Sequence, residues 1–471
     1  MTKNNLKNRK KEKTGKDREV HFLSDLSLAA SSFYDKKDRT DHVLIIAHSD
    51  ADGYAAATII SKMLRRENLE NTTVFFSRES PWEVFLENSL ASLNHIENLS
   101  VFFVDLGSDL EEIVPIFEDD IIEVYILDHH EMRGNYSLDL PDQIHLVNPS
   151  IYGYDGIKEV AGATVAYLFA KEISIKNIDC AWIALIGISL DCLMNIAKFR
   201  SFNKEVVEEA VQEDQIILKE GLWVYGATNE RVSDALAHSL YPYVKEVGGD
   251  EHKAYNDLIT LGIDPKKKVE DLTDEEVEKI DDYYDTTLKG QYAILPKKKS
   301  LLRYAFEHGL MLNIGHHYDA IETAKLIAKP SCSGDFKKEY RKYTSKVTKH
   351  LSRYMDLPKL ITPNVILVEA DKSIPQDNWG DVSSYSSVNK LYNPKKVLLL
   401  GGDKQTHVKL HVRCTDEYPP LQEGKGCDIV IEKMKKKFGG VGGGHKLAGS
   451  YKIAPNRFKK LKKRIDQIFP L

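Results

Sequence analysis

The stretch Val43-Leu44-Ile45-Ile46-Ala47-His48-Ser49-Asp50-Ala51-Asp52-Gly53 joins an apolar run directly to a short polar motif. Five consecutive apolar residues fit a strand that is buried on both faces. The glycine lets the chain turn tightly into a helix, which we expect over residues 53–66. Polar side chains placed just after such a strand lie at the carboxyl edge of a sheet, where open α/β folds bind ligands.

The same pattern recurs along the first half of the chain. Further apolar runs occupy residues 74–76, 101–104 and 121–127, and helical stretches follow at 81–93, 109–117, 161–172 and 178–190. Strands that alternate with helices predict βαβ units and a parallel sheet. We therefore expect an α/β fold, with a parallel-sheet catalytic domain over residues 40–200.

The rest of the 471-residue chain is expected to form other parts. Residues 1–20 are basic and poor in apolar groups, which predicts a disordered tail. Residues 201–330 are rich in helical patterns and predict an inserted or linking region. Residues 360–471 return to strands and predict a smaller α/β domain, which contains the glycine cluster Gly439–His445.

The composition argues against a membrane-spanning protein and against a disulfide-rich protein. No apolar run reaches the ~18 residues that a membrane span needs, and the five cysteines are scattered without a Cys-x-x-Cys pair. This favours a reducing, cytoplasmic setting. The net charge of −6 does not indicate nucleic-acid binding by itself. Two basic runs, Lys433–Lys437 and Lys459–Arg464, fit a nucleic-acid contact and a solvated helix face equally well.

Acidic and histidine side chains gather where the expected strands end, and one more aspartate, Asp191, ends the apolar helix expected over residues 181–190. A single aspartate in such a place is usually a helix cap. Several of them meeting at one sheet edge would repel one another unless cations were bound between them. Imidazole and carboxylate together suit Mn²⁺, or Mg²⁺ where oxygens dominate, and two such ions can drive phosphoryl displacement. The residues are His48, Asp50, Asp52, Asp105, Asp128, His129, His130 and Asp191.

In their order along the chain, these residues resemble the four motifs of the DHH phosphoesterase superfamily. The run Gly442-Gly443-Gly444-His445 resembles the glycine-rich motif of the DHH-associated domain, and Arg413 resembles its phosphate-binding arginine. Segments 148–156, 162–168 and 310–315 resemble the archaeal-type RecJ-like nucleases, in which the last segment is a helix that lines the cleft. His316 stands where those nucleases often have arginine.

The resemblance implies a role for each residue. His48 and Asp50 would hold one divalent ion, the triad of Asp52, His129 and Asp191 would hold the other, and Asp105 would bridge them. Asp128 would orient a histidine, and His130 would face the scissile phosphate as a donor or acid. Arg413 and the segment Gly442–His445 would bind substrate phosphate from the second domain.

Three functions remain open at this point. The length, the second domain and the RecJ-like segments favour an exonuclease that hydrolyses single-stranded DNA or RNA from one end, in replication or repair. The second possibility is a phosphatase for short oligoribonucleotides, cyclic dinucleotides or nucleotides. The third is a replisome scaffold; nuclease and scaffold could coexist, because the resemblance includes nucleases that bind the GINS complex of the replicative helicase.

Overall fold

The computed structural model describes residues 15–76, 81–117, 122–132, 140–156, 158–192, 196–227, 230–295, 304–315, 333–444 and 446–469. The chain divides into two compact units. The first comprises Met1–Glu220 and Gly290–Lys337, and the second comprises Gly221–Lys289 and Lys338–Leu471. Among the described helices, none combines the length and the apolar character needed to cross a membrane.

A five-stranded parallel sheet forms the centre of the first unit, in the order β2-β1-β3-β4-β5. This confirms the predicted α/β class and the parallel sheet. Its strands are β1 (His42–His48), β2 (Asn71–Phe76), β3 (Leu99–Val104), β4 (Glu123–Leu127) and β5 (Ile144–Val147). The interior position of β1, between β2 and β3, explains its unbroken apolar sequence, since residues 43–47 are fully buried.

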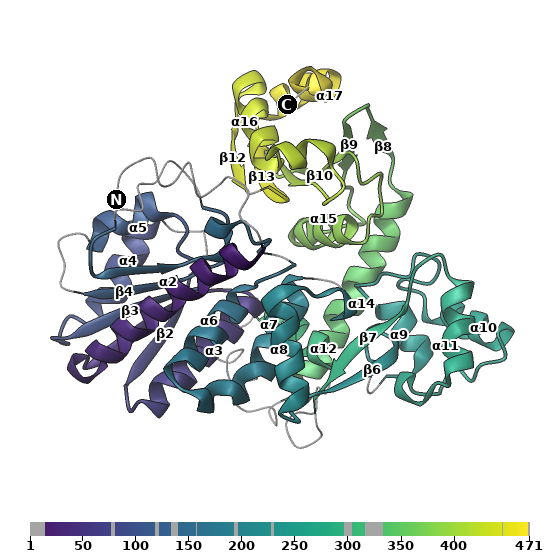
Figure 1. The fold of residues 1–471 in the computed structure, drawn as a ribbon. Coiled ribbons are helices and arrows are strands. Elements are labelled where there is room, and N and C mark those ends of the chain that lie inside the picture. Colours follow the sequence, from purple (N-terminus) through teal and green to yellow (C-terminus); the bar gives the residue numbers. More distant parts are fainter. Residues whose placement is uncertain are drawn as a thin grey trace. The chain divides into compact units, whose positions relative to one another are not determined.

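Helices cover both faces of this sheet (Figure 1). Leu44 and Ile46 of β1 pack in one core cluster with α4 and α5, while α2, α3 and α6 lie on the other face. Next to α3 lies α7, which in turn packs against α8 and α12. The bounds are α2 (Gly15–Lys36), α3 (Ala51–Arg66), α4 (Trp82–Ala91), α5 (Leu110–Phe117), α6 (Gly162–Ile173), α7 (Ala181–Asp191), α8 (Ser201–Gln212) and α12 (Ala305–Gly315).

The N-terminal segment differs from the expected disordered tail. Residues 1–14 lie outside the described part of the chain, but residues 15–20 already belong to α2. Phe22, Leu26 and Phe33 are buried at helical spacing on this helix. Near its start, Arg18 forms an ion pair with Glu159 at 2.7 Å. The burial of one apolar face therefore extends regular structure into the basic segment.

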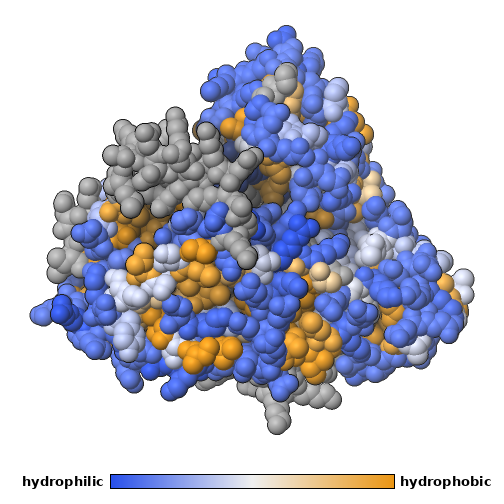
Figure 2. Space-filling model, viewed as in Figure 1, coloured by the Kyte–Doolittle hydropathy of each residue, from blue (hydrophilic) through white to orange (hydrophobic). Residues whose placement is uncertain are grey.

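The second unit contains a six-stranded mixed sheet in the order β12-β13-β11-β10-β9-β8. Only β9 and β10 pair in parallel. The helices α16 and α17 cover one core of this sheet, α15 packs on β10 and β11, and Figure 2 shows a largely hydrophilic surface over α16 and α17. The bounds are α14 (Ser333–Asp356), β8 (Lys359–Ile361), β9 (Val365–Glu369), α15 (Trp379–Val388), β10 (Val397–Asp403), β11 (Val408–Arg413), α16 (Cys427–Phe438), β12 (Val441–Gly444), β13 (Ala448–Ile453) and α17 (Pro455–Arg464).

The region expected as one helical insertion, residues 201–330, is divided between the two units. Helices α8 and α12 pack on α7 in the first unit, whereas Gly221–Lys289 belongs to the second. Within the second unit, Arg341 of α14 forms ion pairs with Glu230 and Asp234 at 2.9 and 3.2 Å. The remaining elements are β6 (Ile217–Leu222), α9 (Val232–His238), α10 (Glu251–Thr260), α11 (Asp274–Tyr283) and β7 (Lys289–Ile294).

Candidate metal centre

The turn between β1 and α3 carries three of the candidate ligands. Asp50 caps α3, because its side chain accepts the backbone N–H of Gly53 at 3.0 Å. A Cβ atom at position 53 would lie 2.1 Å from the backbone oxygen of His48. Only glycine therefore fits, and the tight turn holds His48, Asp50 and Asp52 near one end of the strand.

Asp105 follows β3 directly and is held in an unusual backbone conformation. Its φ of +58° lies in the left-handed region, which costs a non-glycine residue about 1–2 kcal/mol. The residue is only 1% exposed. Although His48 Nδ1 lies 3.6 Å from Oδ2, neither oxygen of Asp105 receives a hydrogen bond of acceptable geometry from the described residues. A buried carboxylate without donors fits a metal ligand, because a cation would compensate its charge.

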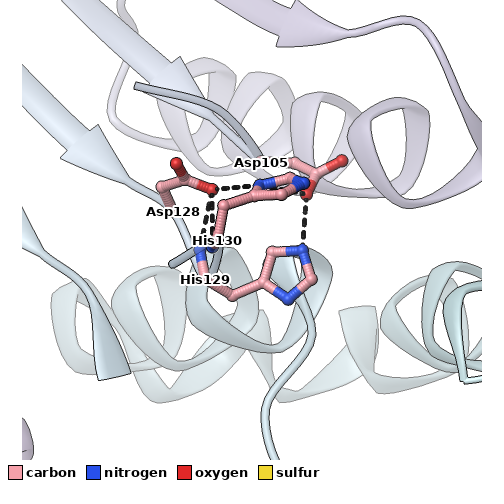
Figure 3. Close-up of side chains that lie close together, drawn as sticks. All are labelled: Asp105, Asp128, His129 and His130. Carbon is pink, nitrogen blue, oxygen red and sulfur yellow. Dashed lines mark hydrogen bonds and ion pairs between the residues drawn. The ribbon is translucent and has the colours of Figure 1, made fainter. Parts of the chain in front are cut away.

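The hydrogen bonds of His129 define its tautomer. Nδ1 lies 2.7 Å from the backbone oxygen of Gly156, and a carbonyl can only accept, so Nδ1 carries the proton. In a neutral ring Nε2 then presents its lone pair 3.0 Å from Asp105 Oδ1 (Figure 3). The same atom lies 3.8 Å from Asp52 Oδ2. A lone pair facing two carboxylates is repulsive unless a cation or a proton lies between them. A backbone carbonyl behind the ring is also the usual partner of a metal-bound imidazole.

Asp128 is satisfied by protein donors instead. One of its oxygens accepts the backbone N–H groups of His129 and His130 at 2.8 and 3.2 Å, and the other accepts Ser108 N–H at 2.9 Å. The Nδ1 atom of His130 lies 2.7 Å from the same carboxylate (Figure 3). Asp128 therefore orients His130 and keeps its Nε2 atom available, and the His130 side chain is 43% exposed.

Asp52 and Asp191 complete a second group of ligands around His129. Asp52 is 2% exposed and accepts two backbone N–H groups at the start of α6, from Gly162 at 2.7 Å and Ala163 at 2.9 Å. Burial, together with the negative charges of Asp105 and Asp191, raises its pKa well above the usual range. Burial likewise raises the pKa of Asp191 to about 6, against the lowering influence of His129. The acids are thus crowded in a way that a divalent cation would relieve.

The structure brings the predicted ligand residues of the first unit together in overlapping groups. The atoms of each group lie within 4.8 Å of one another and could hold a metal ion. One group consists of His48, Asp50 and Asp105. A second group consists of Asp52, His129 and Asp191. Asp105 also faces this second group, because its Oδ1 atom lies 3.0 Å from His129 Nε2. A third grouping of Asp105, Asp128, His129 and His130 includes the carboxylate that protein donors already satisfy. Oxygen and imidazole donors in this mixture fit Mn²⁺ or Mg²⁺.

Three supporting residues were not identified as such from the sequence. Asn313 of α12 accepts the Ala51 N–H at 2.6 Å, between the two aspartates of the first motif. Ser108 and Asn148 hold Asp128 and the backbone oxygen of His130 in place. Asn148 and Asn313 lie in segments that resemble the RecJ-like nucleases, and this resemblance was the signal that could have identified them. No feature of the sequence indicated a role for Ser108.

In the second unit, Arg413 lies at the end of β11 on the face that carries α15. Its guanidinium donates to Ser384 Oγ at 3.0 Å and to the backbone oxygens of Val412 and Gly449 at 2.9 and 3.2 Å. It forms no ion pair with a carboxylate in the described part of the chain. Burial lowers its pKa. The glycines 442–444 form β12, which pairs with β13 beside β11, while His445 and His316 lie outside the described residues.

Comparison with known proteins finds a family similarity for one segment of the first unit. Residues 42–188 match the model described as the DHH family, N-terminal domain. This segment of the chain is similar to the DHH family. The matched segment contains the parallel sheet and every candidate ligand of the first unit except Asp191, which follows three residues later. This similarity supports a hydrolase that acts on phosphoesters.

Similarity to individual proteins extends over most of the chain. The uncharacterized protein MJ0831 of Methanocaldococcus jannaschii is 27% identical over 445 residues, which cover 91% of this chain and 93% of that protein. Among solved structures, CDC45 from Entamoeba histolytica matches with a TM-score of 0.65 at 13% identity, covering 94% and 99% of the two chains. A DHH domain described as a member of the s1p family of ribosomal proteins, PF0399, matches with a TM-score of 0.55 at 14% identity, covering 98% and 93%. At these identities the two solved structures show a shared fold.

Proposed function

We propose that this chain hydrolyses phosphodiester bonds in single-stranded DNA or RNA from one end, with two divalent ions, Mn²⁺ foremost, in its DHH domain. The geometry of His129 carries the proposal. Its Nδ1 proton is engaged by Gly156, and its Nε2 atom faces the buried carboxylates of Asp105 and Asp52. Such an arrangement is stable when a cation takes the lone pairs.

The position of Asp105 between two groups of candidate ligands supports the binding of two ions rather than one. His48 and Asp50 approach this carboxylate from the β1 turn, and His129 approaches it from the end of β4. When bound, a pair of divalent ions activates a water and stabilises the charge that develops on the phosphoryl oxygens. A carboxylate whose two oxygens face opposite ligand groups suits the bridging position.

His130 is suited to act on the substrate itself. Asp128 holds its Nδ1 atom, so that Nε2 can donate a proton or a hydrogen bond to a phosphate oxygen. The partly exposed ring is accessible to a substrate, unlike that of His129, which is 5% exposed. We assign metal binding to His129 and contact with the scissile phosphate to His130.

Substrate binding is assigned to the second unit as well. Arg413 has a half-buried guanidinium that forms no ion pair with a described carboxylate and donates to Gly449 of β13, the strand that pairs with β12. A planar guanidinium binds phosphate through paired hydrogen bonds. The RecJ-like segments of the sequence favour a nucleic-acid strand over a single nucleotide. A replication role and binding to a GINS complex remain predictions of that resemblance.

Digestion of end-labelled single-stranded DNA and RNA tests the proposal, with Mn²⁺ added and with a chelator as the control. We expect metal-dependent release of mononucleotides and resistance of duplex substrates. A length series separates the alternative: rates that peak at two to five nucleotides and vanish for long strands would indicate a short-oligonucleotide hydrolase. The Asp105→Ala variant must be inactive in the same assay, which excludes a contaminating nuclease.

A further inference from the structure

Helix α14 carries a straight row of cations along its exposed side. Its members are spaced by four, four, three and four residues: Lys338, Lys342, Lys346, Lys349 and Arg353. At 3.6 residues per turn these positions fall within about 80° of arc, and at 1.5 Å per residue they extend over about 22 Å. All five side chains are exposed. We call this row the α14 stripe.

The opposite side of α14 is a regular apolar face. Tyr340, Val347, Leu351 and Tyr354 are at most 2% exposed. Burial of this face fixes the rotation of the helix about its axis, so the α14 stripe cannot turn inward. Its orientation is therefore determined by the packing of the second unit.

Ion pairs with acidic side chains are few along the stripe in the described part of the chain. Lys342 has one at 3.6 Å, Glu339 on the same helix, whereas Lys338, Lys346, Lys349 and Arg353 form no ion pair there. Arg341, which lies outside the row, shows the contrast, because it is paired with both Glu230 and Asp234. A cation with a structural role on this helix thus has acidic partners.

The spacing also opposes helix stability. Like charges three or four residues apart each destabilise a helix by about 0.2–0.5 kcal/mol, and the stripe contains four such neighbouring pairs. The helix dipole favours cations only in the last turn, which accounts for Arg353 but not for the others. The chain as a whole has a net charge of −6, so a row of five cations in which only Lys342 forms an ion pair is not an effect of composition.

We propose that the α14 stripe binds the sugar–phosphate backbone of a nucleic-acid strand at several consecutive phosphates. A linear polyanion matches a linear row of cations, and contact with phosphates positions a strand without reading its bases. This inference rests on the proposed function for the choice of partner. It concerns a binding surface within the second unit and requires no metal or hydrolysis.

The test measures binding to a labelled single-stranded oligonucleotide in the presence of chelator, over a range of salt concentrations. The variant carries Lys338→Gln, Lys346→Gln, Lys349→Gln and Arg353→Gln, which remove charge but keep helix propensity and the side-chain stem. The matched control removes the same number of charges from the last basic helix: Lys459→Gln, Lys460→Gln, Lys463→Gln and Arg464→Gln. Lysine-to-arginine replacements at 338, 346 and 349 provide a charge-preserving variant.

We expect the stripe variant to lose about tenfold or more in affinity at low salt. The slope of log affinity against log salt should fall by about 0.7 for each phosphate contact that is lost. The α17 control and the arginine variant should bind nearly as well as the unmodified chain. Equal losses in the stripe and α17 variants would overturn the assignment, because affinity would then follow net charge alone.

Two further arms examine other occupants of the stripe. Polyglutamate and anionic vesicles are added as probes of an acidic protein and of a lipid surface. If the stripe binds one of these probes and does not bind the oligonucleotide, the proposed nucleic-acid partner is wrong and the partner is an acidic protein or a lipid surface. A chain that binds DNA through the stripe but fails to hydrolyse it would refute the proposed function alone. Hydrolysis and oligonucleotide binding that are both unchanged in the stripe variant would refute the stripe alone.

Discussion

The buried carboxylate of Asp52 accepts the backbone N–H of Gly162, the first residue of α6, at 2.7 Å. The next residue of the helix donates to the second oxygen at 2.9 Å. The positive end of the α6 dipole therefore offsets part of the cost of burying this charge. Asp52 is thus fixed by a helix that begins 110 residues further along the chain, before any ion binds.

The first prediction concerns the bridging position. Asp105→Ala should lower the rate of Mn²⁺-dependent hydrolysis by about a thousandfold or more, because it removes the carboxylate that both ligand groups share. Single-turnover rates on a labelled oligonucleotide measure this loss. Near-full activity in the variant would contradict the assignment of Asp105.

The second prediction separates the adjacent histidines. His129→Ala should reduce bound metal, since its Nε2 atom faces two carboxylates, whereas His130→Ala should retain metal and lose turnover. Metal content by elemental analysis, compared with single-turnover rates, distinguishes the two effects. Equal loss of metal in both variants would remove the distinction.

The third prediction concerns Asn313, which accepts the Ala51 N–H. Asn313→Ala should weaken metal binding by about tenfold, in the range measured for residues that support metal ligands. Asn313→Asp keeps an oxygen acceptor and should retain more of the affinity. Metal titration by calorimetry gives the affinities, and unchanged binding in the alanine variant would show that the turn holds its shape without this contact.

The parts of the site that could be predicted from the sequence are motifs of a few consecutive residues. His48, Asp50 and Asp52 form one turn, and Asp105 and Asp128 directly follow strands, so the apolar runs locate these residues at one edge. Asp191 instead ends helix α7. The contacts of Asn313 and Gly162 with that turn could not be predicted, because they depend on how helices distant in sequence pack. Helix α2 could have been recognised from the spacing of Phe22, Leu26 and Phe33, but the basic residues before it suggested disorder.

The fourth prediction concerns pH and stability in the second unit. Burial on β11, with the positive charge of Arg413 nearby, lowers the pKa of His411 to about 3. Because an unfolded chain has a histidine pKa near 6.5, protonation favours unfolding as the pH falls from about 6.5 towards 3. His411→Gln should therefore lose about 2 kcal/mol less stability than the unmodified chain between pH 7 and pH 5. Urea unfolding at both pH values, with chelator present, measures the difference, and parallel losses would contradict it.

The last prediction concerns Gly162, where the methyl group of an alanine would have two opposite effects, one on helix stability and one on the position of Asp105. Replacing a helical glycine by alanine usually stabilises a protein by about 0.5–1 kcal/mol, since alanine has the higher helix propensity. At this position, however, a Cβ atom would lie 2.5 Å from Asp105 Oδ1, closer than two such atoms can approach. Gly162→Ala should therefore displace Asp105 or shift the start of α6 away from Asp52. We expect weaker metal binding and slower hydrolysis, with no gain in the stability of the metal-free chain. Metal titration and urea unfolding of the same preparation decide the matter: a variant that is more stable and binds metal normally would show that Asp105 does not occupy the position on which the proposed bridge depends.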